Sequence, residues 1–324
     1  MNTPNLVVVK PTRSNKYNHS KYIQLSLLAL ALQIPIVSLA DGRPGSGPPE
    51  SAQYGDGWRT TLTAAYVGQG KSDLDNHGEF SVDRGIIEFE TARRFGQRWF
   101  TGLSIGYAED NYDFSNSVVK PLWGDIRSLQ FGVSMRYLAS DEWTLFGLPI
   151  LRYTTEKGVN LDEGREYGLL AGASYRFSDK LTLGPGLGLF SGIGGEEDIF
   201  PILLINWKMT DSLSLETGRG TAASRGPGLA LKWKPSTQWE FGIAARYEKT
   251  RFRLAGELEN IGVDKAVPVV LTANWKYKRS FSLTALAGME TSGSLSLEDR
   301  DGNRISKSSY DAAPLAGLVA SYKF

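Results

Sequence analysis

Apolar and polar residues alternate along most of this chain with a period of two. The pattern begins at Trp58 and is clear at 129–137, 167–177 and 239–247, where every second residue is mainly apolar. Successive side chains of a β-strand point to opposite faces, so each segment predicts a strand with one apolar face and one polar or small face. We therefore expect an all-β protein.

Short and long connections alternate between these strands. The links Ser140–Trp143, Ser178–Leu181 and Thr210–Leu213 contain Asp and Ser or Thr, whose side chains cap backbone amides in tight turns. Longer polar stretches lie between the short links, at 68–79, 109–125, 156–164, 248–264 and 291–312. Short periplasmic turns and longer outer loops are typical of a transmembrane up-and-down antiparallel β-barrel.

The alternation predicts fourteen strands, an even number as expected when both termini lie in the periplasm. The strands that leave the short turns are expected near 58–67, 99–108, 143–154, 181–190, 213–219, 239–248 and 281–290. The returning strands are expected near 84–95, 126–138, 165–177, 199–209, 226–234, 266–277 and 315–324. Twelve or sixteen strands are the alternatives, because 143–153 and 199–209 are apolar on both faces. The segment 191–197 fits an outer turn or a bulge.

Tryptophans mark one boundary of the predicted membrane region. Seven of the eight lie at strand ends near the start of the pattern or a short turn: Trp58, Trp99, Trp143, Trp207, Trp233, Trp239 and Trp275. Trp123 lies in a long polar stretch instead. An indole is favoured at the membrane–water interface. The alternative is a soluble β-sandwich or barrel, whose core would scatter tryptophans along strand centres.

The first forty residues differ from the rest. They hold four lysines and arginines and no acidic residue, followed by an apolar core at 25–32 and Ser38-Leu39-Ala40. We predict a signal peptide at 1–40, cleaved after Ala40, a flexible periplasmic lead-in at 41–57, and the barrel at 58–324. An anchoring helix is the alternative, although Gln24, Gln33 and Pro35 shorten the apolar stretch. Cleavage changes the formal net charge from +1 to −3, which leaves no basic excess to suggest nucleic acid as a partner.

The chain ends in an alternating strand that closes with Tyr322 and Phe324, and Gly317 precedes this pair. The last eight residues resemble the carboxy-terminal signal of Gram-negative outer-membrane proteins. In architecture, the mature chain resembles porin-like barrels of proteobacteria. The resemblance implies a location in the cell outer membrane, contact with its lipid, and recognition of the last strand by the barrel-assembly machinery.

If the apolar faces meet lipid, the opposite faces place charged residues inside the barrel. The candidate lumen-lining residues are Arg59, Glu88, Glu90, Arg136, Glu166, Arg176, Lys208, Glu216, Lys232, Glu240, Arg246, Lys276 and Glu290. An arginine or lysine at mid-depth in hydrocarbon costs about 2–4 kcal/mol, so these groups need water or each other. About fourteen strands enclose a lumen too wide for side chains to fill.

These inner faces predict a passive or weakly selective pore for small hydrophilic solutes. One alternative is a structural barrel closed by salt bridges, and another is a surface-recognition barrel that acts through its long loops at 109–125 and 291–312. The stretch 109–125 is also the candidate for a loop folded into the lumen, as in trimeric porins. No feature of the sequence specifies an oligomeric state.

The sequence offers little catalytic chemistry. The absence of cysteine excludes disulfides, thiolate metal sites and a cysteine nucleophile. We expect no metal and no cofactor, since Ala65–Ser72 lacks the first glycine of a phosphate loop and Asp299–Asn303 fits a simple turn better than a cation loop. His77, near Asp73 and Asp75, is the basis of a minor alternative, an outer-membrane hydrolase. We therefore do not predict an enzyme.

Overall fold

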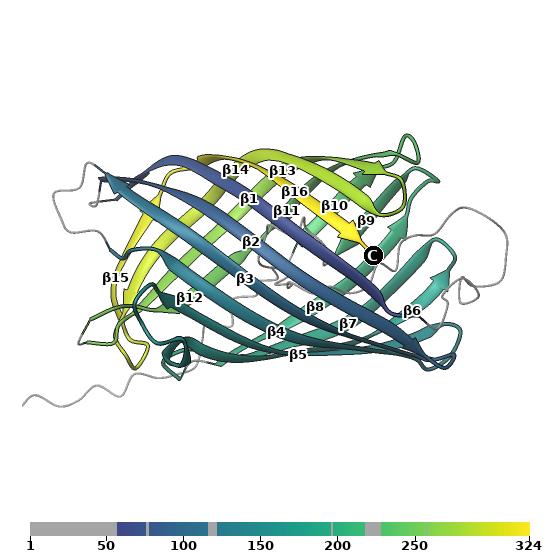
Figure 1. Cartoon of the computed structure of the whole chain (residues 1–324), viewed down its shortest axis with the longest axis horizontal. Coiled ribbons are helices and arrows are strands. Elements are labelled where there is room, and N and C mark those ends of the chain that lie inside the picture. Colours follow the sequence, from purple (N-terminus) through teal and green to yellow (C-terminus); the bar gives the residue numbers. More distant parts are fainter. Residues whose placement is uncertain (1–56, 76–77, 116–121, 196, 218–227, 257) are drawn as a thin grey trace, which may run out of the picture.

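The computed structural model describes residues 57–75, 78–115, 122–195, 197–217, 228–256 and 258–324. They form a closed antiparallel barrel of fourteen strands (Figure 1). The predicted signal peptide and nearly all of the lead-in lie outside these ranges, so both stay predictions. Within the described ranges, helical structure is limited to the 3-10 turn η2 (Leu161–Gly164). No helix there is long and apolar enough to cross a membrane.

The fourteen predicted strands are confirmed, each at its expected place. The strands that leave the short-turn end are β1 (Arg59–Leu74), β3 (Trp99–Ser115), β5 (Trp143–Glu156), β7 (Leu181–Ser191), β9 (Leu213–Thr217), β11 (Trp239–Arg246) and β14 (Phe281–Glu298). The returning strands are β2 (Gly78–Phe95), β4 (Ile126–Leu138), β6 (Arg165–Ser178), β8 (Glu197–Lys208), β10 (Gly228–Trp233), β13 (Ile261–Tyr277) and β16 (Ala313–Lys323). The ring closes where β1 pairs with β16, from Thr61↔Lys323 to Gln69↔Leu315.

The outer surface carries a belt of exposed apolar side chains. Leu103, Ile87 and Leu271 are 51%, 57% and 63% exposed on three different strands, as expected where lipid replaces water. The belt on β3 runs from Trp99 to Tyr107. At about 3.3 Å per residue and a tilt of about 40°, this run covers roughly 20 Å of membrane, close to the usual apolar band of about 25 Å.

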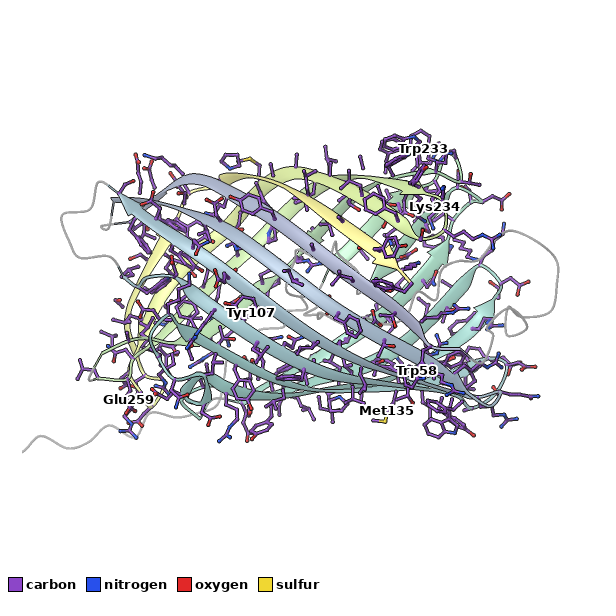
Figure 2. All side chains as sticks on the ribbon, in the orientation of Figure 1. Trp58, Tyr107, Met135, Trp233, Lys234 and Glu259 are labelled. Atoms are coloured by element: carbon purple, nitrogen blue, oxygen red, sulfur yellow. The ribbon has the colours of Figure 1, made fainter. Side chains whose placement is uncertain are left out.

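Aromatic side chains gather at the short-turn end of the belt. Trp99 packs on Tyr137 with ring centroids 4.6 Å apart, and Trp143 packs on Tyr175 at 5.0 Å. Trp58 and Trp233 lie at this end, opposite Glu259 (Figure 2). The rings point outward, so the tryptophan pattern does mark one membrane interface, as predicted, and not the core of a soluble protein.

The outer end is more regular than the sequence suggested. The predicted long polar stretches contain the outer parts of β1, β3, β13 and β14 and two further strands, β12 (Glu248–Arg253) and β15 (Arg304–Tyr310). These segments are polar, yet pairing satisfies their backbone amides and carbonyls as well as a turn would. Within the predicted segment 191–197, the described residues 192–195 follow β7 as an outer turn, not as a bulge.

The barrel narrows above the belt. β12 continues from β11 but pairs in parallel with β5, at Arg253↔Thr155, and β15 joins β1 at Leu74↔Tyr310. Strands β1–β5 and β12–β15 thus close a nine-strand ring, which we call the collar, while β6–β11 and β16 take no part in it. An odd number of strands requires one pair that runs in the same direction, and β5 with β12 is that pair. Figure 1 shows β12 and β15 at the end opposite the C-terminus.

Candidate functional site

The collar is filled by apolar side chains. Phe80 and Phe252 are fully buried in it, and Trp123 packs edge-on against Phe252 with ring centroids 5.0 Å apart. We call the whole cluster the plug; its buried members are Leu74, Phe80, Val82, Trp123, Ile126, Phe252, Leu254, Ala266, Leu295 and Tyr310. A ring of about eight strands is just wide enough for side chains to fill, so a filled nine-strand collar is the expected outcome.

The position of Trp123 concerns the stretch 109–125, the candidate for a loop folded into the lumen. It follows β3 in the stretch 109–125, whose residues 116–121 lie outside the described ranges. The end of this stretch does turn inward, because Trp123 is 5% exposed within the plug. The tryptophan that stood apart from the membrane interface in the sequence therefore has a packing role.

A buried charge cluster joins the collar to the barrel wall. Arg84 on β2 lies 3.3 Å from Glu290 on β14 and 3.7 Å from Asp264 on β13. The hydroxyl groups of Tyr310 and Tyr112 donate to Glu290 and Asp264, both at 2.8 Å. A polar cavity is lined by Arg84, Asp110, Tyr112, Glu248, Thr250, Asp264 and Ala266. These contacts tie β2 and β3 to β13, β14 and β15, which are distant from them in the sequence.

Glu156 holds the parallel seam of the collar. Its two carboxylate oxygens accept hydrogen bonds from the backbone amides of Gly124, at 2.6 Å, and Ala255, at 2.7 Å. One side chain of β5 thereby fixes the segment before β4 and the segment after β12. Nearby, the Lys157 ammonium bonds Asp125 at 3.3 Å, and this hydrogen bond raises the pKa of Lys157.

A polar margin lies beside the collar, where β12 faces strands that end below it. Lys249 on β12 bonds Asp198 on β8 at 2.7 Å, and Arg152 on β5 bonds Glu166 on β6 at 3.3 Å. We define the polar margin by these four residues. Beside the polar margin, the turn after β7 packs on the collar, where Ile193 forms a buried apolar cluster with Ile261 and Val263.

The predicted lumen-lining residues all lie on the strand face opposite the exposed apolar residues, which in a closed barrel is the inner face. Four of them come together near the short turns, where Glu216 binds Lys232 at 2.7 Å and Glu240 lies within 4 Å of Lys232 and Lys276. The others are spread along the wall. Glu290 belongs to the buried charge cluster, Glu166 to the polar margin, and Arg136 stacks on Phe100 at 3.9 Å.

Sequence reasoning missed two apolar patches on the inner wall. One comprises Ala65, Val67, Ile86, Ala108, Leu286, Leu315 and Val319, on β1–β3, β14 and β16. The other comprises Leu148, Ile150, Leu170 and Ile202, on β5, β6 and β8. Most of the second patch lies on β5 and β8, which carry apolar residues on both faces. The alternation of apolar and polar residues therefore could not reveal it. Arg84 was also missed, although it shares a strand face with Glu88 and Glu90.

Two sequence motifs suggested possible metal-binding or catalytic chemistry, the loop Asp299–Asn303 and His77. Asp299 accepts hydrogen bonds from the backbone amides of Asp301 and Asn303, at 3.0 and 2.8 Å, as a turn requires. His77, the basis of the hydrolase alternative, lies outside the described residues. Among the described residues, no group of three or more histidines and carboxylates is arranged to hold a metal ion.

Comparisons with known proteins concern the fold. No protein-family model matches the chain, and no curated protein matches its sequence. An outer membrane channel from Pseudomonas putida F1 superposes with a TM-score of 0.46 at 9% identity, over 82% of this chain and 95% of that one. A Pseudomonas aeruginosa FadL homologue gives 0.45 at 13%, over 82% and 89%. The P. putida toluene transporter TodX gives 0.44 at 11%, over 85% and 92%. At these values the likeness is limited to the barrel.

The closed ring, the lipid-facing belt and the aromatic interface together define the class of this protein. It is an outer-membrane β-barrel of fourteen strands with an inner face that is partly charged and partly apolar. At its outer end, nine of its strands close the narrower collar, which is filled by the plug.

Proposed function

We propose that the barrel is a channel for small hydrophilic solutes. The observation that carries this proposal is the spacing of the inner walls. The two apolar patches lie on separate arcs of the ring and share no described residue, and charged strands separate them. A wall of fourteen strands lies about 14 Å from the axis, too far for opposing side chains to meet. Arg136, Glu216 and Arg246 are buried against the wall, and we propose that the exposed charges, such as Arg59 and Arg176, face water and line a pore.

The proposed route avoids the plug. Solutes pass the polar margin beside β12, descend along the inner faces of β6–β10, and leave through the short-turn end. An ion pair such as Lys249–Asp198 can exchange its partners for water or for a passing polar solute, which the packed rings of the plug cannot do.

Conductance tests this proposal. The purified protein in a planar bilayer should give discrete current steps. Ser214→Trp, which places an indole on the inner face between Lys208 and Lys232, should reduce the step size. The matched control is Leu215→Trp, one residue along β9 and facing lipid, which should leave the step unchanged.

A gel shift between boiled and unboiled samples verifies that each variant is folded. If the folded wild-type barrel gives no current steps at all, the channel proposal is wrong. The sequence-based alternative, a non-conducting structural or recognition barrel, would then be favoured.

A further inference from the structure

Each of the seven strands that run toward the short-turn end carries an inward-facing cation close to that end. Three are arginines: Arg94 on β2, Arg136 on β4 and Arg176 on β6. Four are lysines: Lys208 on β8, Lys232 on β10, Lys276 on β13 and Lys323 on β16. We call these seven residues the cation ring.

Membrane-facing aromatic residues keep the cation ring at one level. An aromatic residue follows the cation in six of the strands, as in Arg176-Phe177, Lys232-Trp233 and Lys276-Tyr277, and precedes it in Trp207-Lys208. Neighbouring residues of a strand point to opposite faces, so an aromatic ring on the outside implies a cation on the inside. The outer rings belong at the membrane interface. The cations therefore lie at the same depth around the lumen.

Few carboxylates oppose the cation ring among the described strands. The strands that leave the same turns add one further inward cation, Arg59, and two inward carboxylates, Glu216 and Glu240. Glu240 is shared, because it lies 3.9 Å from Lys232 and 3.7 Å from Lys276, and Lys234 after β10 lies 3.3 Å from it. Arg94 and Arg136 both lie over the ring of Phe100, and Glu90 on β2 adds a third inward carboxylate, four residues before Arg94. Cations thus outnumber carboxylates at this level.

The field of the cation ring reaches the middle of the lumen. With the wall about 14 Å from the axis, the head of an arginine or lysine, about 6 Å from the backbone, lies about 8 Å from the axis. The Debye length is about 10 Å at 0.1 M salt. An ion on the axis is therefore within reach of all seven charges, and a ring of one sign lining a pore selects ions of the other sign.

We infer that the cation ring is the selectivity element of this barrel and makes it prefer small anions, such as solutes that carry carboxylate or phosphate groups. This inference rests on the proposed channel function and specifies its substrate class. The cation ring lies close to the periplasmic end of the lumen, so it acts at the inner mouth and not at the collar.

The permeability ratio of chloride to potassium tests the inference. It is obtained from the reversal potential of the reconstituted channel in a potassium chloride gradient. The wild type should favour chloride. The double variant Arg176→Gln/Lys208→Gln should lower the ratio about twofold, because it removes two of the seven charges. The matched control is Lys71→Gln/Lys307→Gln, which removes two cations from the collar and should leave the ratio unchanged.

The possible results distinguish a failure of anion selectivity from a failure of the channel function. Current steps with no chloride preference, or a ratio that Arg176→Gln/Lys208→Gln leaves unchanged, would overturn the role of the cation ring and leave the channel intact. The preference should also shrink in 1 M salt, where the Debye length is about 3 Å; a constant ratio would point to pore size instead. A folded barrel without current steps would overturn both.

Discussion

Two inward-facing glycines illustrate how the wall restricts single residues. Both lie within long strands, Gly106 on β3 and Gly288 on β14. A Cβ atom at Gly288 would lie 2.0 Å from the carbonyl oxygen of Val269, part of the neighbouring backbone. At Gly106 the nearest atom would be 3.9 Å away. The same residue type is thus required at one position and replaceable at the other.

We therefore predict that Gly288→Ala destabilises the barrel and that Gly106→Ala does not. The added methyl group at 288 must push two paired strands apart, and such overpacking costs about 1–3 kcal/mol. The measurement is the urea concentration at which the unboiled, fast-migrating gel band is half lost. Equal midpoints for Gly288→Ala and the wild type would contradict the close approach of β13 and β14.

At the scale of elements, the collar depends on one short parallel contact. β5 and β12 pair at Arg253↔Thr155, and the carboxylate of Glu156 secures the adjoining backbone. The Cα atoms of paired residues on neighbouring strands lie about 5 Å apart, which is within the range of a disulfide.

We predict that the double variant Thr155→Cys/Arg253→Cys forms a disulfide under mild oxidation. The chain has no cysteine of its own, so a band shift reversed by reductant reports this bond alone. The control is Thr155→Cys/Lys307→Cys, whose second cysteine lies on β15, on another side of the collar; it should stay reduced. A double variant at 155 and 253 that never crosslinks would mean that the nine-strand ring is open.

The barrel was more predictable from the sequence than the collar. The period of two persists wherever one strand face meets lipid, so residues such as Leu103 and Ile105 identify their strand without further information. The pairing of β5 with β12 depends on residues 155 and 253 meeting across six intervening strands, and no local pattern encodes that. The polar segments 291–298 and 304–310 resemble loops for the same reason, because their partners and not their side chains make them strands.

The candidate site was predicted only in part. The charged inner residues followed directly from alternation, since Arg136 and Glu240 oppose apolar neighbours. The apolar patch around Leu170 did not, because both faces of β5 and β8 are apolar there. The plug was also missed: its residues come from loops and strand ends that meet only after the ring narrows.

At the scale of the whole molecule, one belt of lipid-facing residues surrounds an interior that we propose to be hydrated. Leu103 and Ser104 are adjacent on β3, with Leu103 51% exposed in the belt and Ser104 paired with Glu90 on the inner face. An arginine meets hydrocarbon at the first position and water at the second.

We predict that Leu103→Arg lowers the free energy of unfolding by about 2–4 kcal/mol, the usual cost of arginine near the midplane. Ser104→Arg should change it by less than about 1 kcal/mol, because the guanidinium reaches water and Glu90. Urea titration of folding in lipid vesicles measures both. Similar losses in the two variants would indicate that the interior is not hydrated at that depth.

The odd number of strands in the collar also sets an order of events. A ring built from hairpins alone places every strand beside its neighbour in the chain, apart from one closing pair. The collar has its closing pair in β1 with β15 and a second distant pair in β5 with β12, and β6–β11 lie between the strands of this second pair in sequence. Contacts so distant along the chain form only after the intervening chain is in place. We therefore expect closure of the collar to be a late step of assembly, after the strands of the wall have paired.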